Sequence, residues 1–323
     1  MFNFSNHNST VLFNQGQILI EIEKLVKSIL ATYQPIRLMT HGQPQNAYFN
    51  GMFYMDILNQ LPRLLTVYSP VHQYSEHIEA LWAGCMSIGL IAQSQWFSGM
   101  ALYHGTLDIS HAITLVQSVV AYAKTPSFTR KLSDRLNQAK ERNKNLRYYA
   151  ASLHAKYPKL MVISICFSYL KEHRVGINDV CDQWEDMLYR IQAERKNTFK
   201  HAVGYAWGIE QGSENGGYHI HAVFYFNGNK RQYDQRMAKR IGDLWESLTA
   251  CHGYYRSSND DKTKARFARN GTLGVGMILR SDPVACANAT NMLCYLAKID
   301  KDDQYLRMKP KGRRTFGKGH FPD

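Results

Sequence analysis

Two neighbouring segments constrain the fold of this 323-residue chain more than any other feature. Residues 203–210 and 216–226 are rich in β-branched and aromatic side chains, which favour strands. The loop between them, residues 211–217, contains three glycines, and glycines suit the backbone of a tight connection. The two segments therefore predict an antiparallel β-hairpin, whose second strand ends at Asn227 and Gly228.

Two histidines and a glutamate are expected on one face of this hairpin. Because side chains alternate along a strand, His219 and His221 point to one face. The other face carries Ile220, Ala222, Phe224 and Phe226. If the hairpin closes, Glu210 lies near both histidines. One carboxylate and two imidazoles are a typical ligand set for a divalent metal. Small residues on the same face leave room for a ligand: Gly204, Ala206 and Gly208.

The alternative is that none of these three side chains binds a metal. Paired histidines on a strand are often surface or hydrogen-bonded residues, and a glutamate at a strand end is often exposed and idle. The glycine-lined face favours the metal interpretation.

A third segment, residues 288–299, has helical periodicity. At 100° per residue, a polar stripe forms opposite an apolar side, and it consists of Asn288, Asn291, Tyr295 and Lys298. A lysine one turn from a tyrosine favours the phenolate and can neutralise a phosphate. The alternative is a half-buried tyrosine with its hydroxyl in water.

Glu210, the His219-Ile220-His221 triplet and Tyr295-x-x-Lys298 occur in an order that resembles the HUH endonucleases. These are rolling-circle replication initiators, relaxases and one-tyrosine transposases. The chain is more similar still to the inovirus-type replication initiation proteins of filamentous phages and of bacterial prophage or satellite elements. That resemblance runs from about residue 160 to residue 319, and it includes residues 201–207, 241–245, 249, 253, 274–278 and 313–317. The first 125 residues have no comparable match.

The resemblance implies a fold, a mechanism and partners. The fold would be α+β, with an RRM-like antiparallel sheet that carries the histidines and a tyrosine on a later helix. Glu210, His219 and His221 would bind Mg²⁺ or Mn²⁺, and Tyr295 would attack phosphorus to give a 5′-phosphotyrosine and a free 3′-OH, with Lys298 steadying the phenolate or the phosphate. The partners would be single-stranded or origin DNA and host replication proteins, such as a helicase and a polymerase.

Other segments of residues 158–323 complete this predicted catalytic domain. Strands are expected at 160–170 and 274–279, and amphipathic helices around 184–191 and 237–248. This order predicts a sheet with helices on one face and an open face that holds the metal. The tail, residues 307–320, suggests an extended basic arm for phosphate or a disordered basic tail. The cations expected to contact DNA are Arg236, Lys239, Arg240, Arg313, Arg314 and Lys318.

The rest of the chain is expected to be helical. Residues 1–126 predict an α-helical domain of unknown role, with amphipathic or apolar helices around 18–29, 77–91 and 110–123. Residues 127–157 predict one long basic helix whose heptad seam contains a polar Asn143. A connecting helix and a DNA contact are both consistent with this segment, and a homodimeric coiled coil is less so. An oligomer is possible.

Charge is unevenly distributed along the chain. Residues 1–126 carry a net charge of −1 and residues 127–323 a net charge of +14, which favours a polyanionic partner for the second part. No stretch is long and apolar enough for a membrane span, and the N-terminus lacks a signal-peptide pattern. The six cysteines are scattered without a C-x-x-C pair, which predicts reduced thiols and a cytoplasmic protein without a membrane partner.

Two alternatives to the endonuclease differ in class. A non-catalytic module on an RRM-like sheet would bind single strands by aromatic stacking. A metal-dependent hydrolase would use His219 and His221 without Tyr295. The presence of the glutamate, both histidines and the Tyr-Lys pair together favours the endonuclease.

Overall fold

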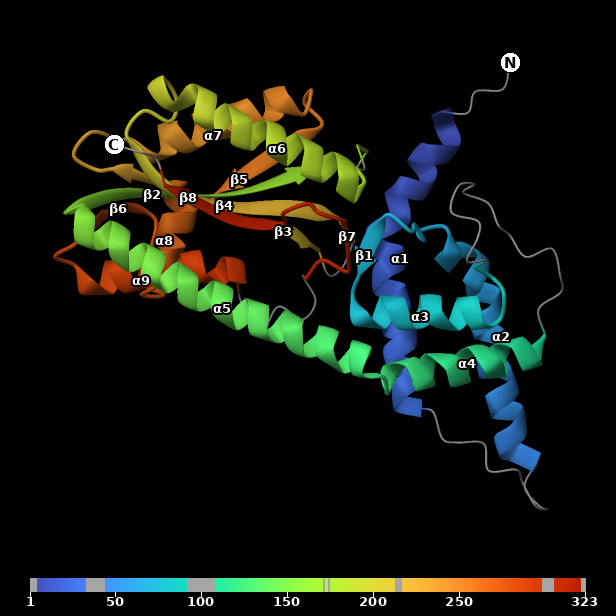
Figure 1. The fold of residues 1–323 in the computed structure, drawn as a ribbon. Coiled ribbons are helices and arrows are strands. Elements are labelled where there is room, and N and C mark those ends of the chain that lie inside the picture. Colours follow the sequence, from blue (N-terminus) through green and yellow to red (C-terminus); the bar gives the residue numbers. More distant parts are fainter. Residues whose placement is uncertain are drawn as a thin grey trace. The chain divides into compact units, whose positions relative to one another are not determined.

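The structure is a computed structural model that describes residues 5–32, 44–91, 108–170, 172–173, 175–212, 217–297 and 305–320. These residues form two compact units (Figure 1). The helical unit takes the chain up to Arg135 together with Arg307–Lys311, and the sheet unit takes the rest from Leu136.

The helical unit is built from helices and one small two-stranded sheet. Its elements are α1 (Ser5–Thr32), α2 (Pro44–Leu65), β1 (His72–Tyr74), α3 (Glu76–Ser87), α4 (Ile109–Ala123), the start of α5 (Pro126–Lys156) and β7 (Met308–Pro310). Ile18, Ile22 and Ile29 of α1 are all buried, as the predicted amphipathic helix requires. β7 comes from far along the chain and pairs antiparallel with β1. Next to it, Arg307 is buried and forms an ion pair with Glu23 of α1.

A second buried carboxylate, Glu76, lies at the start of α3. Arg135 donates to it at 2.8 Å, and a ring nitrogen of His77 lies 3.4 Å from the same oxygen. Burial raises the pKa of Glu76, but hydrogen bonds from His77 and Arg135 outweigh burial and lower this pKa to about 2. The carboxylate therefore binds its proton less tightly in the folded chain than in the unfolded chain.

This difference predicts a pH-dependent stability. Because the pKa of Glu76 is depressed on folding, its stabilisation is present above the unfolded value of 4.5 and is lost as the pH falls towards 2. We expect Glu76→Gln to lower the free energy of unfolding by about 3 kcal/mol at neutral pH, with a difference that shrinks below pH 4.5. Denaturant titrations at several pH values measure it. Glu21→Gln, which removes a surface pair with Arg63, should cost less than about 1 kcal/mol; a Glu76→Gln difference independent of pH would contradict the prediction.

The sheet unit contains an antiparallel six-stranded sheet, so the chain is α+β, as predicted. The strands follow the order β5-β2-β4-β3-β8, and β6 also pairs with β2. Besides the rest of α5, the elements are β2 (Lys159–Tyr169), α6 (Ile177–Ala193), the 3₁₀ turn η1 (Glu194–Lys196), β3 (Ala202–Gln211), β4 (Tyr218–Asn227), α7 (Asp234–Leu248), β5 (Gly253–Ser257), α8 (Asp261–Arg269), β6 (Gly276–Leu279), α9 (Pro283–Cys294), the 3₁₀ turn η2 (Tyr295–Ala297) and β8 (Phe316–His320). The sequence interpretation missed β5, α8 and β8.

Helices cover both faces of the sheet, which corrects the expected open face. Helices α6 and α7 pack on one face, where Phe167 of β2 contacts the rings of Trp184 and Trp245. Helices α5 and α9 lie on the other side (Figure 1) and share a buried core with that face. The three predicted metal ligands therefore do not lie on a bare sheet.

The small residues of β3 explain how α5 approaches the sheet. A Cβ at Gly204 would lie 2.2 Å from the hydroxyl oxygen of Tyr149, and that hydroxyl instead donates to the carbonyl oxygen of Gly319 at 2.5 Å. Ala206, on the same face, is fully buried. The space that Gly204 and Ala206 leave is therefore filled by α5 and not by a ligand.

The basic tail is part of both units, so the extended phosphate-binding arm is also corrected. Its first part forms β7, and its last part, β8, pairs antiparallel with β3, with Gly317 opposite Trp207. Between them, Arg313 forms ion pairs with Asp182 and Glu185 of α6. Glycines at 317 and 319 permit this pairing, because a Cβ at Gly317 would lie 2.8 Å from Trp207 Nε1.

All six cysteines are free thiols. Cys85, Cys181 and Cys294 are buried, Cys166 and Cys286 are half-buried, and Cys251 is exposed. Across the described ranges, no helix combines the length and the apolarity that a bilayer-spanning segment needs.

Candidate active site

The β3–β4 hairpin places Glu210, His219 and His221 together, as the sequence predicted. Glu210 lies directly opposite His219, and His221 lies opposite Gly208. An oxygen of Glu210 is 3.6 Å from Nε2 of His219 and 3.5 Å from Nε2 of His221. Glu210 is 7% exposed, and the two histidine side chains are 16% and 26% exposed. The three side chains thus form a half-buried cluster that opens to one side.

The chemistry of this cluster fits a divalent metal ion. Each residue offers one ligand atom, and these atoms all lie within 4.8 Å of one another. Ligands bonded at about 2.0–2.2 Å to one ion are at most about 4.4 Å apart, so small side-chain movements suffice. Nδ1 of His219 faces the carbonyl oxygen of Gly217 at 3.5 Å, which leaves Nε2 turned towards Glu210. A second partner on the far nitrogen is typical of metal-binding histidines.

Tyr295 stands beside this cluster at the end of α9. Its ring centroid is 6.2 Å from that of His221, with the two rings perpendicular, and Tyr295 is 42% exposed. Asp282 caps the start of the helix, and its carboxylate accepts from the backbone N–H of Ala285 at 2.9 Å. Pro283 is the first residue of the helix. Both residues are favoured at helix starts. The phenol is therefore partly open to solvent next to the histidines.

The tyrosine helix differs from the sequence prediction in its bounds. The α-helix begins at Pro283 and ends at Cys294, and Tyr295 opens the 3₁₀ turn η2. Ala289, Leu293, Leu296 and Ala297 are buried, as the predicted apolar side requires. Lys298 lies outside the described residues, so its role stays a prediction.

Asn143 of α5 fixes the end of this helix. Its side-chain nitrogen donates to the carbonyl oxygen of Cys294 at 3.4 Å, and the thiol of Cys294 points back to the carbonyl oxygen of Asn143 at 3.8 Å. Carbonyls in the last turn of a helix have no partner within the helix. Asn143 therefore holds the residue directly before Tyr295. The polar residue in the heptad seam was the sequence signal for this role.

The register of the sheet adds two residues that sequence reasoning did not select. Cys166 of β2 lies opposite both His221 of β4 and Arg256 of β5, so all three side chains share a face. Arg256 is two strand spacings from His221, about 10 Å. Its guanidinium donates to the hydroxyl of Tyr254 at 3.3 Å and lies over the ring of Tyr254. Only long-range pairing reveals this proximity.

The surroundings of Tyr295 disfavour its ionised form. Burial raises the pKa of Tyr295 above its usual value, and electrostatic interactions with Glu210 and then with Cys166 raise it further. The nucleophile expected from the sequence is therefore protonated in the metal-free protein at neutral pH.

Removing the charge of Glu210 tests this coupling. In metal-free protein we expect Glu210→Gln to lower the pKa of Tyr295, because one of the charges that oppose the phenolate is gone. NMR titration of ¹³C-labelled tyrosines, assigned with Tyr295→Phe, measures the shift. Asp243→Asn is the control, because Asp243 contributes to the raised pKa of Tyr255. It should lower the pKa of Tyr255 and leave the titration of Tyr295 unchanged. An unchanged Tyr295 titration in Glu210→Gln would show that the two groups do not interact.

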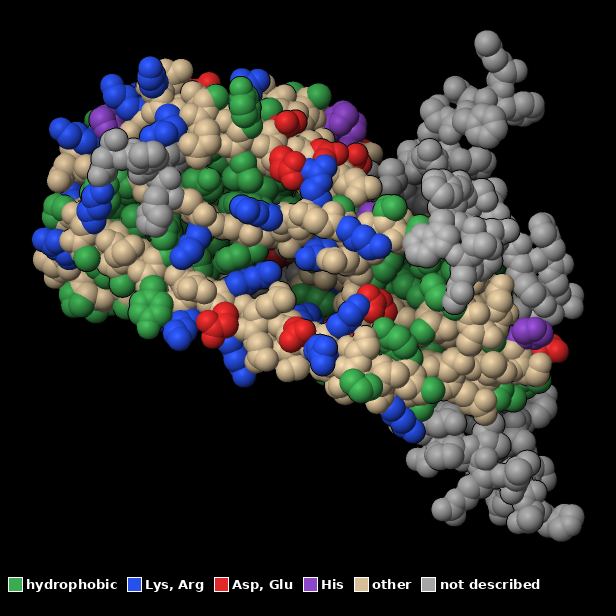
Figure 2. All heavy atoms as spheres, viewed as in Figure 1, with side chains coloured by type: hydrophobic (Ala, Val, Ile, Leu, Met, Phe, Trp, Pro, Cys, Tyr) green, Lys and Arg blue, Asp and Glu red, His purple; other side chains and the backbone are tan. Residues whose placement is uncertain are grey.

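The predicted DNA-binding cations differ in their surroundings. Lys239 pairs with Asp243 at 2.8 Å, and Lys318 lies over the ring of Tyr149 at 5.1 Å. Arg313 is paired with carboxylates of α6, whereas Arg314 is exposed. Arg236 and Arg240 line a pocket at the start of α7. Lys and Arg side chains are frequent over the visible face of the sheet unit (Figure 2), and their contact with DNA stays a prediction.

Comparisons with protein-family models, with curated proteins and with solved structures find no match to this chain.

Proposed function

We propose that this protein is a metal-dependent HUH-type endonuclease that nicks and rejoins single-stranded DNA through a tyrosine. One observation carries the proposal: ligand atoms of Glu210, His219 and His221 lie within 4.8 Å of one another, and the Tyr295 ring lies 6.2 Å from that of His221. Segments far apart in the chain thus meet in the combination that this chemistry needs. The resemblance to inovirus-type proteins supports a role in starting replication of a phage, satellite or related mobile element.

The order of elements in the sheet unit also supports the proposal. From β2 to β5 the chain runs strand, helix, strand, strand, helix, strand, apart from the 3₁₀ turn before β3. This is the order of RRM-like and ferredoxin-like folds, and RRM-like sheets carry the histidines in the family that the sequence resembles. β8, α5 and α9 would be additions to that framework.

In the proposed reaction, Tyr295 is the nucleophile. Its phenolic oxygen gives its proton to water and bonds to phosphorus, and the bond from phosphorus to the 3′ oxygen breaks. The 3′ oxygen takes up a proton from water and leaves as a hydroxyl that a polymerase can extend, while the 5′ end stays on the tyrosine. Mg²⁺ or Mn²⁺ held by Glu210, His219 and His221 would supply Lewis-acid stabilisation of the phosphate. Attack by a free 3′-OH on the phosphotyrosine reverses the steps and rejoins the strand.

One described cation, Arg256, would hold the strand on this face. Arg256 lies about two strand spacings from His221 and on the same side of the sheet. The residue between them, Cys166, is small and half-buried, so a phosphodiester can lie across it. Arg256 suits a phosphate because its guanidinium can donate two parallel hydrogen bonds.

The structure disfavours the RRM-like binding module as the main alternative. Such modules stack bases on aromatic side chains of an exposed sheet face. Here α6 and α7 cover one face and α5 and α9 the other (Figure 1). The metal-dependent hydrolase would use the same ligands but would have no need of Tyr295 beside His221.

Covalent capture separates the three possibilities. We would incubate the full chain with a pool of random-sequence single strands and Mn²⁺, denature it, and look for protein that carries DNA. The proposed enzyme gives an adduct that EDTA prevents, and sequencing the captured strands gives the origin. A hydrolase cuts without an adduct, and a binding module does neither; either result would overturn the proposal.

A further inference from the structure

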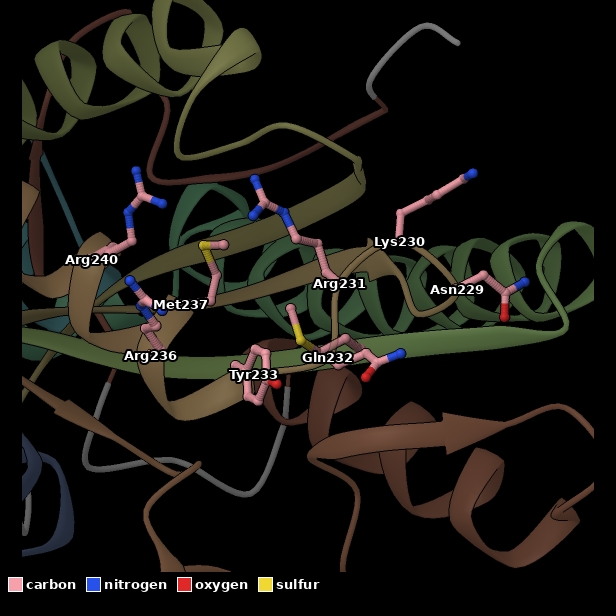
Figure 3. A pocket seen from close by; sticks show the side chains of 9 residues that line it. Asn229, Lys230, Arg231, Gln232, Tyr233, Arg236, Met237 and Arg240 are labelled. Atoms are coloured by element: carbon pink, nitrogen blue, oxygen red, sulfur yellow. The ribbon is translucent and has the colours of Figure 1, made fainter.

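A basic pocket lies at the end of β4 away from the metal ligands (Figure 3). It has a volume of about 390 Å³ and is formed by the loop after β4 and the first turns of α7. Met161 and Met237 supply apolar thioethers, and Arg231, Arg236 and Arg240 gather around Met237 in this view. A pocket of this size is in the range that holds small ligands, about 300–1,000 Å³.

The pocket lies on the other side of the sheet from the metal ligands. Met161 pairs with Phe226, whereas His221 pairs with Cys166, five residues further along β2. Residues an odd number of positions apart on one strand point to opposite faces, so Met161 and Cys166 do. Because His221 pairs with Cys166 and shares its face, Met161 and His221 lie on opposite faces of the sheet. Along β4, His221 and Asn227 are six residues apart, or about 20 Å. The pocket is therefore a site separate from the cleavage centre.

The cations of the pocket are not neutralised by its lining, which contains no acidic residue. Arg236 and Arg240 are one helical turn apart on α7, and in the described part of the chain neither has an ion pair with a carboxylate. Arg231 is held in place, because it donates to the carbonyl oxygens of Lys200 and Asn197 at 3.1 and 3.2 Å. Burial and then the charge of Arg240 lower the pKa of Arg231. Like charges held this close favour an anionic ligand.

The nearest acids are engaged with other partners. Asp243 holds Lys239 at 2.8 Å, and Asp234 pairs with Lys264 at 3.1 Å and accepts from Asn259 at 2.9 Å. Both carboxylates are therefore engaged away from Arg236 and Arg240. Arg63 of α2, an exposed arginine paired with Glu21, is a matched control for the pocket arginines.

An exposed aromatic ring indicates which class of anion the pocket binds. Tyr233, which also lines the pocket, is 75% exposed directly before α7. Proteins hold single strands with arginines that contact the phosphate backbone and with aromatic rings on which bases stack. Methionine sulfur packs favourably against aromatic groups. An acidic peptide would satisfy the charges but would make no use of the tyrosine and the thioethers.

We infer that this pocket binds one unpaired nucleotide of the DNA strand, with its phosphates on the arginines and its base against Tyr233. This inference rests on the proposed function for the identity of the strand. A strand held here and at the metal ligands must extend at least about 20 Å from the cleaved phosphate. The pocket would then anchor flanking DNA while the reacting phosphate changes partners during nicking and rejoining.

Single-charge variants test the pocket in EDTA, where no cleavage occurs. The probe is a fluorescent random-sequence single strand, and binding is measured over a series of salt concentrations. We expect Arg236→Gln and Arg240→Gln each to reduce the slope of log K against log salt by about 0.7, the value for one phosphate contact on a single strand. Arg63→Gln, which removes an exposed arginine paired with Glu21, should leave the slope unchanged. Equal effects of Arg63→Gln and Arg240→Gln would overturn the pocket as a specific site.

A pair of exposed tyrosines tests the base contact. Tyr233→Ala should weaken binding of the single strand by about 5- to 150-fold, the range for loss of one base–aromatic stack. Tyr189→Ala, which removes a ring that is 73% exposed on α6, should have no effect. Binding of heparin, which has charges but no bases, should be unchanged by Tyr233→Ala. Competition by poly-glutamate as strong as that by DNA, with no effect of Tyr233→Ala, would assign the pocket to acidic peptides and overturn the inference.

These measurements are independent of catalysis. If wild-type protein forms no adduct and the Arg240 and Tyr233 variants still lose binding, the proposed nicking is wrong and the nucleotide pocket stands. If the adduct forms and both variants bind like wild type, the pocket is wrong and the proposed function stands. Thermal melting of each variant verifies that the fold is retained.

Discussion

Tyr295→Phe is expected to form no covalent adduct with DNA and to reduce nicking by about 10⁶-fold, as loss of other catalytic nucleophiles does. The substitution keeps the ring that packs beside His221 and removes only the oxygen that would attack phosphorus. Because Tyr295 is 42% exposed, loss of its hydroxyl should leave the fold unchanged. Denaturing gels of protein incubated with labelled single strands and Mn²⁺ measure the adduct.

Tyr254→Phe is the matched control for this experiment. Tyr254 lies on the neighbouring strand β5 and contacts Arg256, so it is close to the same face but is not the proposed nucleophile. It should keep the ability to form the adduct, and both variants should bind DNA as wild type does. Full nicking by Tyr295→Phe would remove the tyrosine from the mechanism.

The second large effect is expected at the metal ligands. His219→Ala and His221→Ala should each weaken Mn²⁺ binding by more than about 100-fold, more than the loss of a residue that only supports a ligand, and should abolish the adduct. Each removes one of three ligand atoms that lie within 4.8 Å of one another. Calorimetric titration of Mn²⁺ measures the affinity, and DNA binding measured in EDTA should be largely retained.

His252→Ala is the control for general loss of a histidine. His252 stacks on His173 with the ring centroids 3.9 Å apart, and it contributes to no described metal cluster. Mn²⁺ affinity should equal that of wild type. If His221→Ala binds Mn²⁺ as tightly as His252→Ala, the hairpin residues are not the metal site.

The hairpin could be predicted from the sequence because its signals are local. Alternation along β3 and β4 and a short glycine-rich connection fix which residues share a face, and only one register brings Glu210 opposite His219. The apolar run of β2 and the amphipathic periodicity of α6 and α7 are also local signals, so these elements could be predicted as well. The cluster of Glu210, His219 and His221 follows from this local pattern, which is why its three members could be predicted together.

Long-range pairing could not be predicted in the same way. Whether Gly204 leaves space for a ligand or for Tyr149 depends on where α5 lies, and no pattern within β3 contains that information. β8 is a short strand in a basic, glycine-rich segment. Its composition predicts an extended arm, and only its pairing with β3 identifies it as a strand. The position of Arg256 near His221 likewise depends on two strand pairings.

The end of the tyrosine helix illustrates a subtler limit. Periodicity gave the buried side correctly, with Leu293 and Leu296 in the core. It could not show that the α-helix stops at Cys294 and tightens into a 3₁₀ turn, because the hydrogen bond from Asn143 that meets the helix end comes from another helix. Helix ends are in general less certain than helix faces.

Peptide mapping of the trapped adduct tests the central claim most directly. Wild-type protein is incubated with single-stranded DNA and Mn²⁺, digested with nuclease and protease, and examined by mass spectrometry for a tyrosine that carries a nucleotide. The proposed mechanism predicts a 5′-linked nucleotide on Tyr295 and none when EDTA is present. A nucleotide on Tyr254, Tyr255 or Tyr305 instead, or DNA cut in the presence of Mn²⁺ with no modified tyrosine, would contradict it.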